Sequence, residues 1–303
     1  MGFMRLTAPA LPAELDIALA FPRYLADLDT QRVHVVDTGS PGDGGPAILL
    51  LHGFPMWSFL WRRVIRRLPG RRVVAPDLVG LGLSDKPRQL SWHTPARHLD
   101  VLVSLVDALE LDDVVVVGQD WGGPLGMGVA AHLESEGRLR GIVLGNTAVL
   151  PPRRPIRVGS FHRFANLPVL SDIAFRGLGF PLPLLSRVQG DPTSIGLLER
   201  LAYRHPFRRL VDRAGLVGVP RMVPNRDGHP SLPFLDRVGH WAESYRGPTS
   251  VVWGLRDPIF GRGLRRLRKA WPHATFTETQ AGHFLQEEVP AEMAEAIEGL
   301  AAG

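Results

Sequence analysis

Short runs of β-branched and other apolar residues alternate along this chain with segments of helical periodicity. Each run is bounded by Gly, Pro or Asp, as is typical of buried strands that end in turns. The alternation predicts an α/β protein with a mostly parallel eight-stranded sheet covered by helices on both faces. The expected strands, of which the first two form a hairpin, are Arg23–Leu28, Val33–Thr38, Ala47–Leu51, Val73–Ala75, Val114–Val117, Gly141–Leu144, Ser250–Trp253 and Thr275–Thr277.

Between the strands, three amphipathic segments are expected to be helices: Pro95–Leu109, Gly122–Leu133 and Pro290–Leu300. From residue 151 to residue 230 the pattern changes, because prolines cluster and apolar residues recur at helical rather than strand intervals. A length of 303 residues suits one large domain with an insertion. We therefore expect a core formed by residues 1–150 and 231–303, with a helical cap at residues 151–230.

The chain contains no cysteine, which excludes disulfides, cysteine-ligated metals and thiol catalysis. The net charge of +5 could suggest a nucleic-acid partner. Only Lys86 and Lys269 are lysines, however, and no aromatic residues or recognition motif accompany the arginines. We interpret the arginines as side chains on solvated helix faces, and we expect no nucleic-acid partner. No signal peptide and no run of about 18 apolar residues is present, so we also expect no membrane partner and a cytoplasmic location.

The window Val114–Gly123 reads as a buried strand followed by Gly-Gln-Asp-Trp-Gly-Gly and then a helix. The central residue of such a strand-to-helix turn adopts a strained backbone conformation, and small neighbours let the turn close. Here that residue is Asp120, and no Gly-x-Ser-x-Gly occurs elsewhere to supply a serine nucleophile. A carboxylate in this place can attack carbon and form an ester intermediate. The alternative is that Asp120 is only an acidic N-cap of the helix.

Two further residues follow strands in an order that favours the catalytic interpretation. Asp257 comes after Trp253-Gly254-Leu255-Arg256, and His283 comes after the last expected strand. Nucleophile, acid and base in this order are typical of the α/β-hydrolase triad. The alternative for Asp257 is a turn-forming residue before a proline. The strand that ends at Leu144 is followed by Gly-Asn-Thr-Ala, which offers no competing acid.

Upstream, His52-Gly53-Phe54-Pro55 follows a strand. In this fold, the backbone N–H just after such a glycine and the N–H of the residue after the nucleophile form the oxyanion hole. We assign these two groups to Phe54 and Trp121.

Several stretches of the chain are similar to those of one known family. In the expected cap they are residues 203–207 (Tyr-Arg-His-Pro-Phe) and 220–224 (Pro-Arg-Met-Val-Pro). In the expected core they are residues 52–62 (His-Gly-Phe-Pro-Met-Trp-Ser-Phe-Leu-Trp-Arg), 75–87 (Ala-Pro-Asp-Leu-Val-Gly-Leu-Gly-Leu-Ser-Asp-Lys-Pro) and 119–123 (Gln-Asp-Trp-Gly-Gly). With these stretches the sequence resembles the haloalkane dehalogenases of the α/β-hydrolase superfamily over nearly the whole chain.

The resemblance implies a role for each residue of the expected site. Asp120 would displace halide from an sp³ carbon, and His283 would activate water to hydrolyse the resulting alkyl ester. Asp257 would orient His283, and the indole N–H of Trp121 would hold the departing halide. The implied partners are a small hydrophobic substrate and water, with no cofactor and no metal. The oligomeric state is left open.

One departure from the family keeps other activities open. These dehalogenases normally have a second halide donor, either an Asn in the place of Phe54 or a Trp in the cap, and this chain has neither. Epoxide hydrolases also use an elbow Asp followed by Trp, with cap phenols or an imidazole that contact the epoxide oxygen; Tyr203 and His205 are the candidates here. A haloacetate dehalogenase fits less well, because that family tends to have Arg in the place of Trp121. A hydrolase-fold protein that only binds a small ligand is the non-catalytic alternative.

Overall fold

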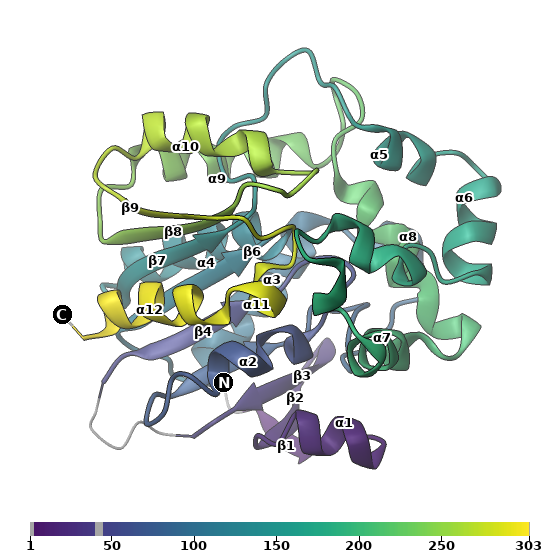
Figure 1. Ribbon diagram of the computed structural model, residues 1–303, viewed down its shortest axis with the longest axis horizontal. Helices are drawn as coiled ribbons and strands as arrows, with labels where there is room; N and C mark the ends of the chain where they lie inside the picture. Colours follow the sequence, from purple (N-terminus) through teal and green to yellow (C-terminus); the bar gives the residue numbers. More distant parts are fainter. Residues whose placement is uncertain (1–2, 40–44, 303) are drawn as a thin grey trace.

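The computed structural model describes residues 3–39 and 45–302. Its centre is a nine-stranded sheet in the order β1-β2-β3-β5-β4-β6-β7-β8-β9 (Figure 1). The strands are β1 (Met4–Thr7), β2 (Arg23–Leu28), β3 (Gln31–Asp37), β4 (Ala47–Leu51), β5 (Val73–Pro76), β6 (Val114–Gln119), β7 (Leu139–Gly145), β8 (Thr249–Gly254) and β9 (Thr275–Thr279).

The sheet has an antiparallel part and a parallel part. Strands β1, β2, β3 and β5 pair in antiparallel fashion, whereas all pairs from β5 through β4 to β9 are parallel. The central strands β4 and β6 are buried along their whole length, because helices cover both faces of a parallel sheet. Parallel strands also bring their carboxyl ends to one edge, where the loops after β4, β6, β7, β8 and β9 meet.

Helices cover both faces of the sheet, as Figure 1 shows. On one face α4 (Gly122–Ser135) packs on β6 and β7 and contacts α3 (Pro95–Ala108) and α9 (Leu232–Ser244). On the other face α12 (Pro290–Ala301) packs on β7 and β8 and contacts α2 (Arg62–Ile65). The remaining core helices are α1 (Ala13–Ala18), α10 (Leu264–Ala270) and α11 (Leu285–Glu288).

Residues 151–230, between β7 and α9, contain helices and no strand. This segment lies beyond the carboxyl ends of the strands, on the right of Figure 1. Its α-helices are α5 (Ser160–Ala165), α6 (Leu170–Asp172), α7 (Leu197–Arg204) and α8 (Ala214–Gly218), separated by 3₁₀ and π turns. We call this segment the cap. The exact boundaries of core and cap stay a prediction from the sequence.

All eight expected strands and the three expected helices are present, with ends that differ by a few residues. The expected number of strands is wrong, because β1 adds a ninth at one edge of the sheet. Strand β1 has only four residues, is mostly exposed and pairs only with β2, so its Met-Arg-Leu-Thr sequence is too short to identify a strand by periodicity. Among the described residues, no helix combines the length and apolarity needed to cross a membrane.

Candidate active site

Asp120 lies at the turn between β6 and α4, with a backbone φ of +51°. This left-handed conformation is strained for a non-glycine residue and costs of order 1–3 kcal/mol. The turn closes because its neighbours are small: a Cβ at Gly122 would lie 2.0 Å from the Leu51 carbonyl oxygen. The hydroxyl of Thr147, after β7, donates to the Asp120 carbonyl at 2.6 Å. The elbow therefore presents the Asp120 carboxylate at the carboxyl edge of the sheet.

The two carboxylate oxygens of Asp120 have different surroundings. Oδ1 accepts a hydrogen bond from the backbone N–H of Phe54 at 2.8 Å, and the backbone N–H of Trp121 also donates to the carboxylate. Oδ2 lies 3.7 Å from Nε2 of His283. Oδ1 is thus held by the Phe54 N–H, Oδ2 faces the expected base, and both N–H groups expected to form the oxyanion hole donate to this carboxylate.

The approach of Phe54 to Asp120 depends on the residues just before it. A Cβ at Gly53 would lie 2.2 Å from Asp120 Oδ1, so only glycine allows the carboxylate to come this close. The fully buried His52 accepts a hydrogen bond from the Leu78 N–H at Nε2 and contacts the Gly53 carbonyl through Nδ1. Burial lowers the pKa of His52 and keeps the ring neutral, as these two bonds require. The His-Gly-Phe motif is therefore a rigid support for one N–H.

His283 and Asp257 form a buried pair beside Asp120, with Nδ1 of His283 2.9 Å from Oδ2 of Asp257. Although burial opposes ionisation of Asp257, the hydrogen bond from His283 holds the pKa of this carboxyl below its usual range. Burial likewise opposes protonation of His283, but the hydrogen bond and charge of Asp257 raise the pKa of the imidazole. Burial also raises the pKa of Asp120, against the charge of His283 and the two N–H donors.

Two amides that the sequence reading did not single out complete this arrangement. Asn146, after β7, donates from Nδ2 to Asp257 Oδ2 at 2.7 Å and accepts the Gly254 N–H at Oδ1. Gln119, the last residue of β6, donates to the His283 carbonyl at 3.0 Å. Both residues stand at the carboxyl end of a strand, β6 for Gln119 and β7 for Asn146, and this position is the sequence signal that could have revealed them. The sequence around Asn146 indicates only that no acid follows this strand.

The surroundings of Asp120 and His283 are aromatic. The ring of Phe161, in α5 of the cap, lies 6.4 Å from that of Phe54, and Phe161 packs on Phe175 and Phe180. Phe260 packs on the His283 ring at 5.7 Å. Among the described residues, none accepts a hydrogen bond from the Trp121 indole, and Trp121 is 7% exposed. The site therefore suits an apolar ligand that carries one group able to accept a hydrogen bond from the Trp121 indole.

Comparison of the chain with known proteins shows the family to which it belongs. A sequence model of the alpha/beta hydrolase family matches residues 48–296. Haloalkane dehalogenase 1 of Mycobacterium tuberculosis (strain ATCC 25618 / H37Rv) is 37% identical over 280 residues, which cover 88% of this chain and 87% of that protein. The haloalkane dehalogenase of Mycolicibacterium paratuberculosis is 35% identical over 277 residues, covering 88% and 86%. The chain belongs to the haloalkane dehalogenase family.

Solved structures of haloalkane dehalogenases agree with this assignment. DatA from Agrobacterium tumefaciens C58 superposes with a TM-score of 0.78 at 26% identity, and the match covers 93% of this chain and 96% of the DatA chain. DpaA from Paraglaciecola agarilytica NO2, solved as a tetramer, gives a TM-score of 0.77 at 26% identity and covers 96% and 97%. The resemblance and the fold class inferred from the sequence are confirmed, and the protein is a hydrolase of the haloalkane dehalogenase family.

The two cap residues considered as donors to an epoxide do not join the Asp120 site. Tyr203, in α7, is fully buried, and its hydroxyl donates to Glu287 of α11. Glu287 also accepts from both Nη atoms of Arg62, and Arg62 donates to Glu199 of α7 at 2.6 Å. We call these four residues the cap-core ion network. His205 is half-buried and forms no hydrogen bond with Asp120, His283 or Tyr203 in the described part of the chain.

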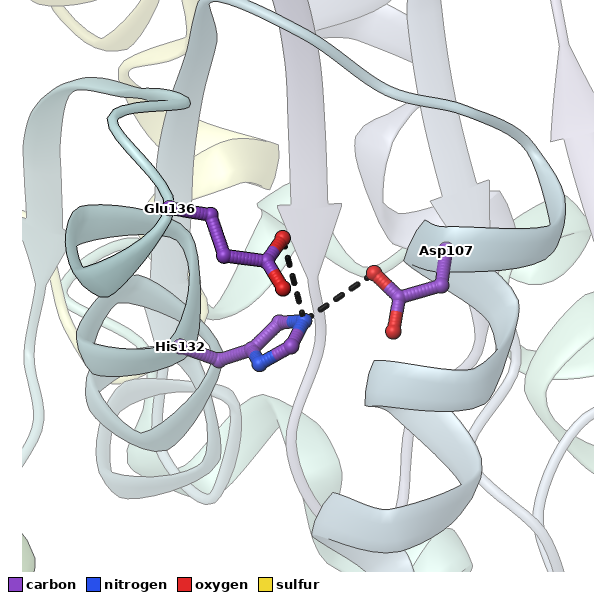
Figure 2. A group of neighbouring side chains, drawn as sticks. All are labelled: Asp107, His132 and Glu136. Atoms are coloured by element: carbon purple, nitrogen blue, oxygen red, sulfur yellow. Dashed lines mark hydrogen bonds and ion pairs between the residues drawn. The ribbon is translucent and has the colours of Figure 1, made fainter.

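A cluster of possible metal ligands lies elsewhere, at the far end of α4. Figure 2 shows His132 between Asp107 and Glu136, with His132 Nε2 3.0 Å from Asp107 Oδ1 and 3.7 Å from Glu136 Oε2. Arg138 Nη1 donates to these same two oxygens, at 2.8 Å and 2.5 Å. The guanidinium already pairs with both carboxylates and would repel a cation. We therefore interpret the cluster as an exposed ion-pair network.

Proposed function

We propose that this protein hydrolyses small hydrophobic haloalkanes to an alcohol and halide through an ester on Asp120. The observation that carries this proposal is the asymmetric Asp120 carboxylate, whose Oδ1 accepts from the backbone N–H of Phe54 while Oδ2 faces His283. In the first step Oδ2 attacks the carbon that bears the halogen, the new C–O bond forms, and the C–X pair leaves as halide. In this proposal the indole N–H of Trp121, which has no described acceptor in the protein, donates a hydrogen bond to that halide.

The second step needs a base, because water must attack the ester. His283 Nε2 takes a proton from water, and the hydroxide adds to Cγ of Asp120. Negative charge then develops on Oδ1, which the N–H groups of Phe54 and Trp121 stabilise. Asp257 stabilises the imidazolium. Collapse releases the alkoxide, which leaves as the alcohol after protonation, and the net products are alcohol, halide and one proton.

The structure favours dehalogenation over epoxide hydrolysis. An epoxide oxygen becomes an alkoxide and needs an acidic donor such as a phenol. The cap's only tyrosine, Tyr203, donates to Glu287 instead, and burial together with Glu287 raises the pKa of its hydroxyl. A protein that only binds a ligand has no need of an assembled Asp-His-Asp set. The cytoplasmic location and the absence of a nucleic-acid partner stay predictions from the sequence.

The test is incubation with terminal bromoalkanes and styrene-type epoxides, followed by halide and diol assays. We expect halide release, no release by Asp120→Ala, and a covalent adduct on His283→Phe. The adduct forms because attack needs only the carboxylate, whereas ester hydrolysis needs the base. Mass spectrometry of intact His283→Phe checks this. Diol formation without halide release, or turnover with no adduct on His283→Phe, contradicts the proposal.

A further inference from the structure

The loop that carries His283, residues 280–284, is bound by a segment of the cap, residues 188–191. The backbone N–H of His283 donates to the carbonyl of Val188 at 2.8 Å. The next residue, Phe284, is bound by the side chain of Gln189: its N–H donates to Oε1 at 2.9 Å, and its carbonyl accepts from Nε2 at 3.1 Å. One cap side chain thus satisfies both backbone polar groups of the residue that follows the base.

The two segments are also fitted to each other sterically. A Cβ at Gly282 would lie 2.4 Å from the Gln189 Cα, and a Cβ at Gly190 would lie 2.3 Å from the Gln280 carbonyl oxygen. On the other side Glu288 accepts the N–H groups of Gly282 and Gly190 at Oε1. Gln189 is 7% exposed, so its bonds are shielded from water. The backbone of the His283 loop therefore has no room to shift while Gln189 stays in place.

The nucleophile is supported by different residues. Asp120 is held through Phe54, Thr147 and the β6–α4 turn, all of which belong to the core. No described contact joins Gln189 to these groups; its described partners are Phe284 and Ser194. A change at residue 189 therefore acts first on the loop of the base, which is connected to Asp120 only through His283 itself and the Gln119–His283 hydrogen bond among the described contacts.

We propose that Gln189 is a positioning residue that sets where His283 stands relative to Asp120. The inference rests on the proposed function, in which halide displacement needs only Asp120 and ester hydrolysis needs His283. Loss of the two bonds to Phe284 frees the backbone of the base loop. The imidazole then spends less time in line with the water that attacks Asp120 Cγ, and misplacement by about 1 Å slows a reaction up to about a hundredfold.

The variant that tests this is Gln189→Met, which keeps the length and volume of the side chain but has no N–H donor and only a weak acceptor. Single-turnover reactions with enzyme in excess of 1-bromobutane, quenched in acid, follow halide and alcohol separately. We expect the rate of halide release to stay within about twofold of the parent. Alcohol release should slow by about tenfold to a hundredfold, and the alkyl-ester mass should accumulate on the chain.

Ser194→Ala is the matched control, because it removes only the third bond of the Gln189 amide, to the Ser194 hydroxyl at 3.1 Å. We expect both of its rates to match the parent. Equal slowing of halide and alcohol release in Gln189→Met, or no slowing of either, overturns the positioning role. Partial unfolding lowers the amplitude of the reaction and leaves the ratio of the two rates unchanged, so it also counts against the inference. Absence of halide release from the parent overturns the proposed function itself.

Discussion

In the proposed reaction, the departing halide is stabilised by a single side chain. Trp121 carries an indole N–H with no described acceptor in the protein, and Phe54 offers only its backbone N–H, which binds Asp120. A halide that leaves this pocket therefore has one side-chain donor. Leaving groups that need little stabilisation are favoured, so we expect bromide and iodide to be released faster than chloride.

Replacing Trp121 by Phe should slow halide release by some tens of fold, because a hydrogen bond to an anion worth about 2 kcal/mol is lost. In this variant, the rate of halide release should fall more for chloroalkanes than for bromoalkanes of the same length. Halide assays on the two substrates measure this. Trp241→Phe is the control, since its indole donates to Glu134 on the surface, and it should leave both rates unchanged. Equal activity of Trp121→Phe and the parent would show that the indole does not hold the halide.

The ionisation of His283 is coupled to the state of Asp120. The negative charge of Asp120 contributes to the raised pKa of His283. In the proposed reaction, ester formation removes that charge. A larger fraction of the imidazole is then neutral at a given pH, in the step in which it must act as the base. Asp120→Asn imitates the neutral ester, and we expect the pKa of His283 to be lower in this variant than in the parent.

Titration by NMR of the imidazole nitrogens measures this pKa, and comparison with Asp120→Asn/His283→Gln identifies the signal among the histidines. A pKa that is unchanged or higher in Asp120→Asn contradicts the coupling. For turnover, protonation of His283 blocks ester hydrolysis. Because the ester lacks the Asp120 charge that helps to raise this pKa, the rate of alcohol release should fall with decreasing pH at a midpoint below the pKa of His283 in the free enzyme.

At the scale of the elements, the packing of α4 on β4 decides whether the nucleophile is presented at all. The first residue of α4, Gly122, touches the Leu51 carbonyl, so an added Cβ would push backbone against backbone. Gly122→Ala should destabilise the fold by about 1–3 kcal/mol, as overpacked cores do. Urea denaturation measures the free energy of unfolding.

Gly126→Ala, one turn later in α4, is the matched control. Its Cβ would meet only side-chain atoms, Val116 Cγ1 at 3.3 Å and Leu51 Cδ1 at 3.5 Å. The better helix propensity of alanine, worth up to about 1 kcal/mol, offsets this contact, so stability should change little. Similar unfolding free energies for the two variants would show that the contact at Gly122 does not limit the packing.

How far the sequence predicts these elements depends on how local the signal is. Strand β6 and the elbow at Asp120 are visible because a run of valines and the small residues around the turn lie in one window. Strand β1 is not visible, since it is exposed and is stabilised by pairing with β2. Likewise Asp120, Asp257 and His283 follow from chain order, whereas the partners Asn146, Gln119 and Gln189 depend on loops that only the tertiary fold brings together.

At the scale of the whole molecule, the cap-core ion network connects the cap to the core. Arg62 of α2, Glu287 of α11 and Glu199 and Tyr203 of α7 are all at least nine-tenths buried in their side chains. Two carboxylates share one fully enclosed guanidinium, and Arg63 at the rim supplies a second positive charge. Such a group stabilises the folded state only when every member is bonded.

Tyr203→Phe removes one hydrogen bond to Glu287 and leaves the ion pairs with Arg62 and Arg63 in place. We expect a loss of about 1–3 kcal/mol in the free energy of unfolding, the range for a buried bond to a charged group. Halide release per folded molecule should not change, because the phenol has no part in the reaction. Thermal unfolding and halide assays on the same preparation check both statements. A large loss of activity without loss of stability contradicts the structural role.

The site is assembled from parts that are far apart in the chain. Phe54 and Asp120 are separated by 66 positions, and Gln119 bonds to a residue 164 positions later. Contacts between such distant residues form late in folding, because the entropy cost of closing a long loop comes before the contacts that offset it. During synthesis the β6–α4 elbow leaves the ribosome long before the base that completes it. A growing chain therefore exposes its apolar strand edges until β9 pairs, and this interval is when it depends most on protection from aggregation.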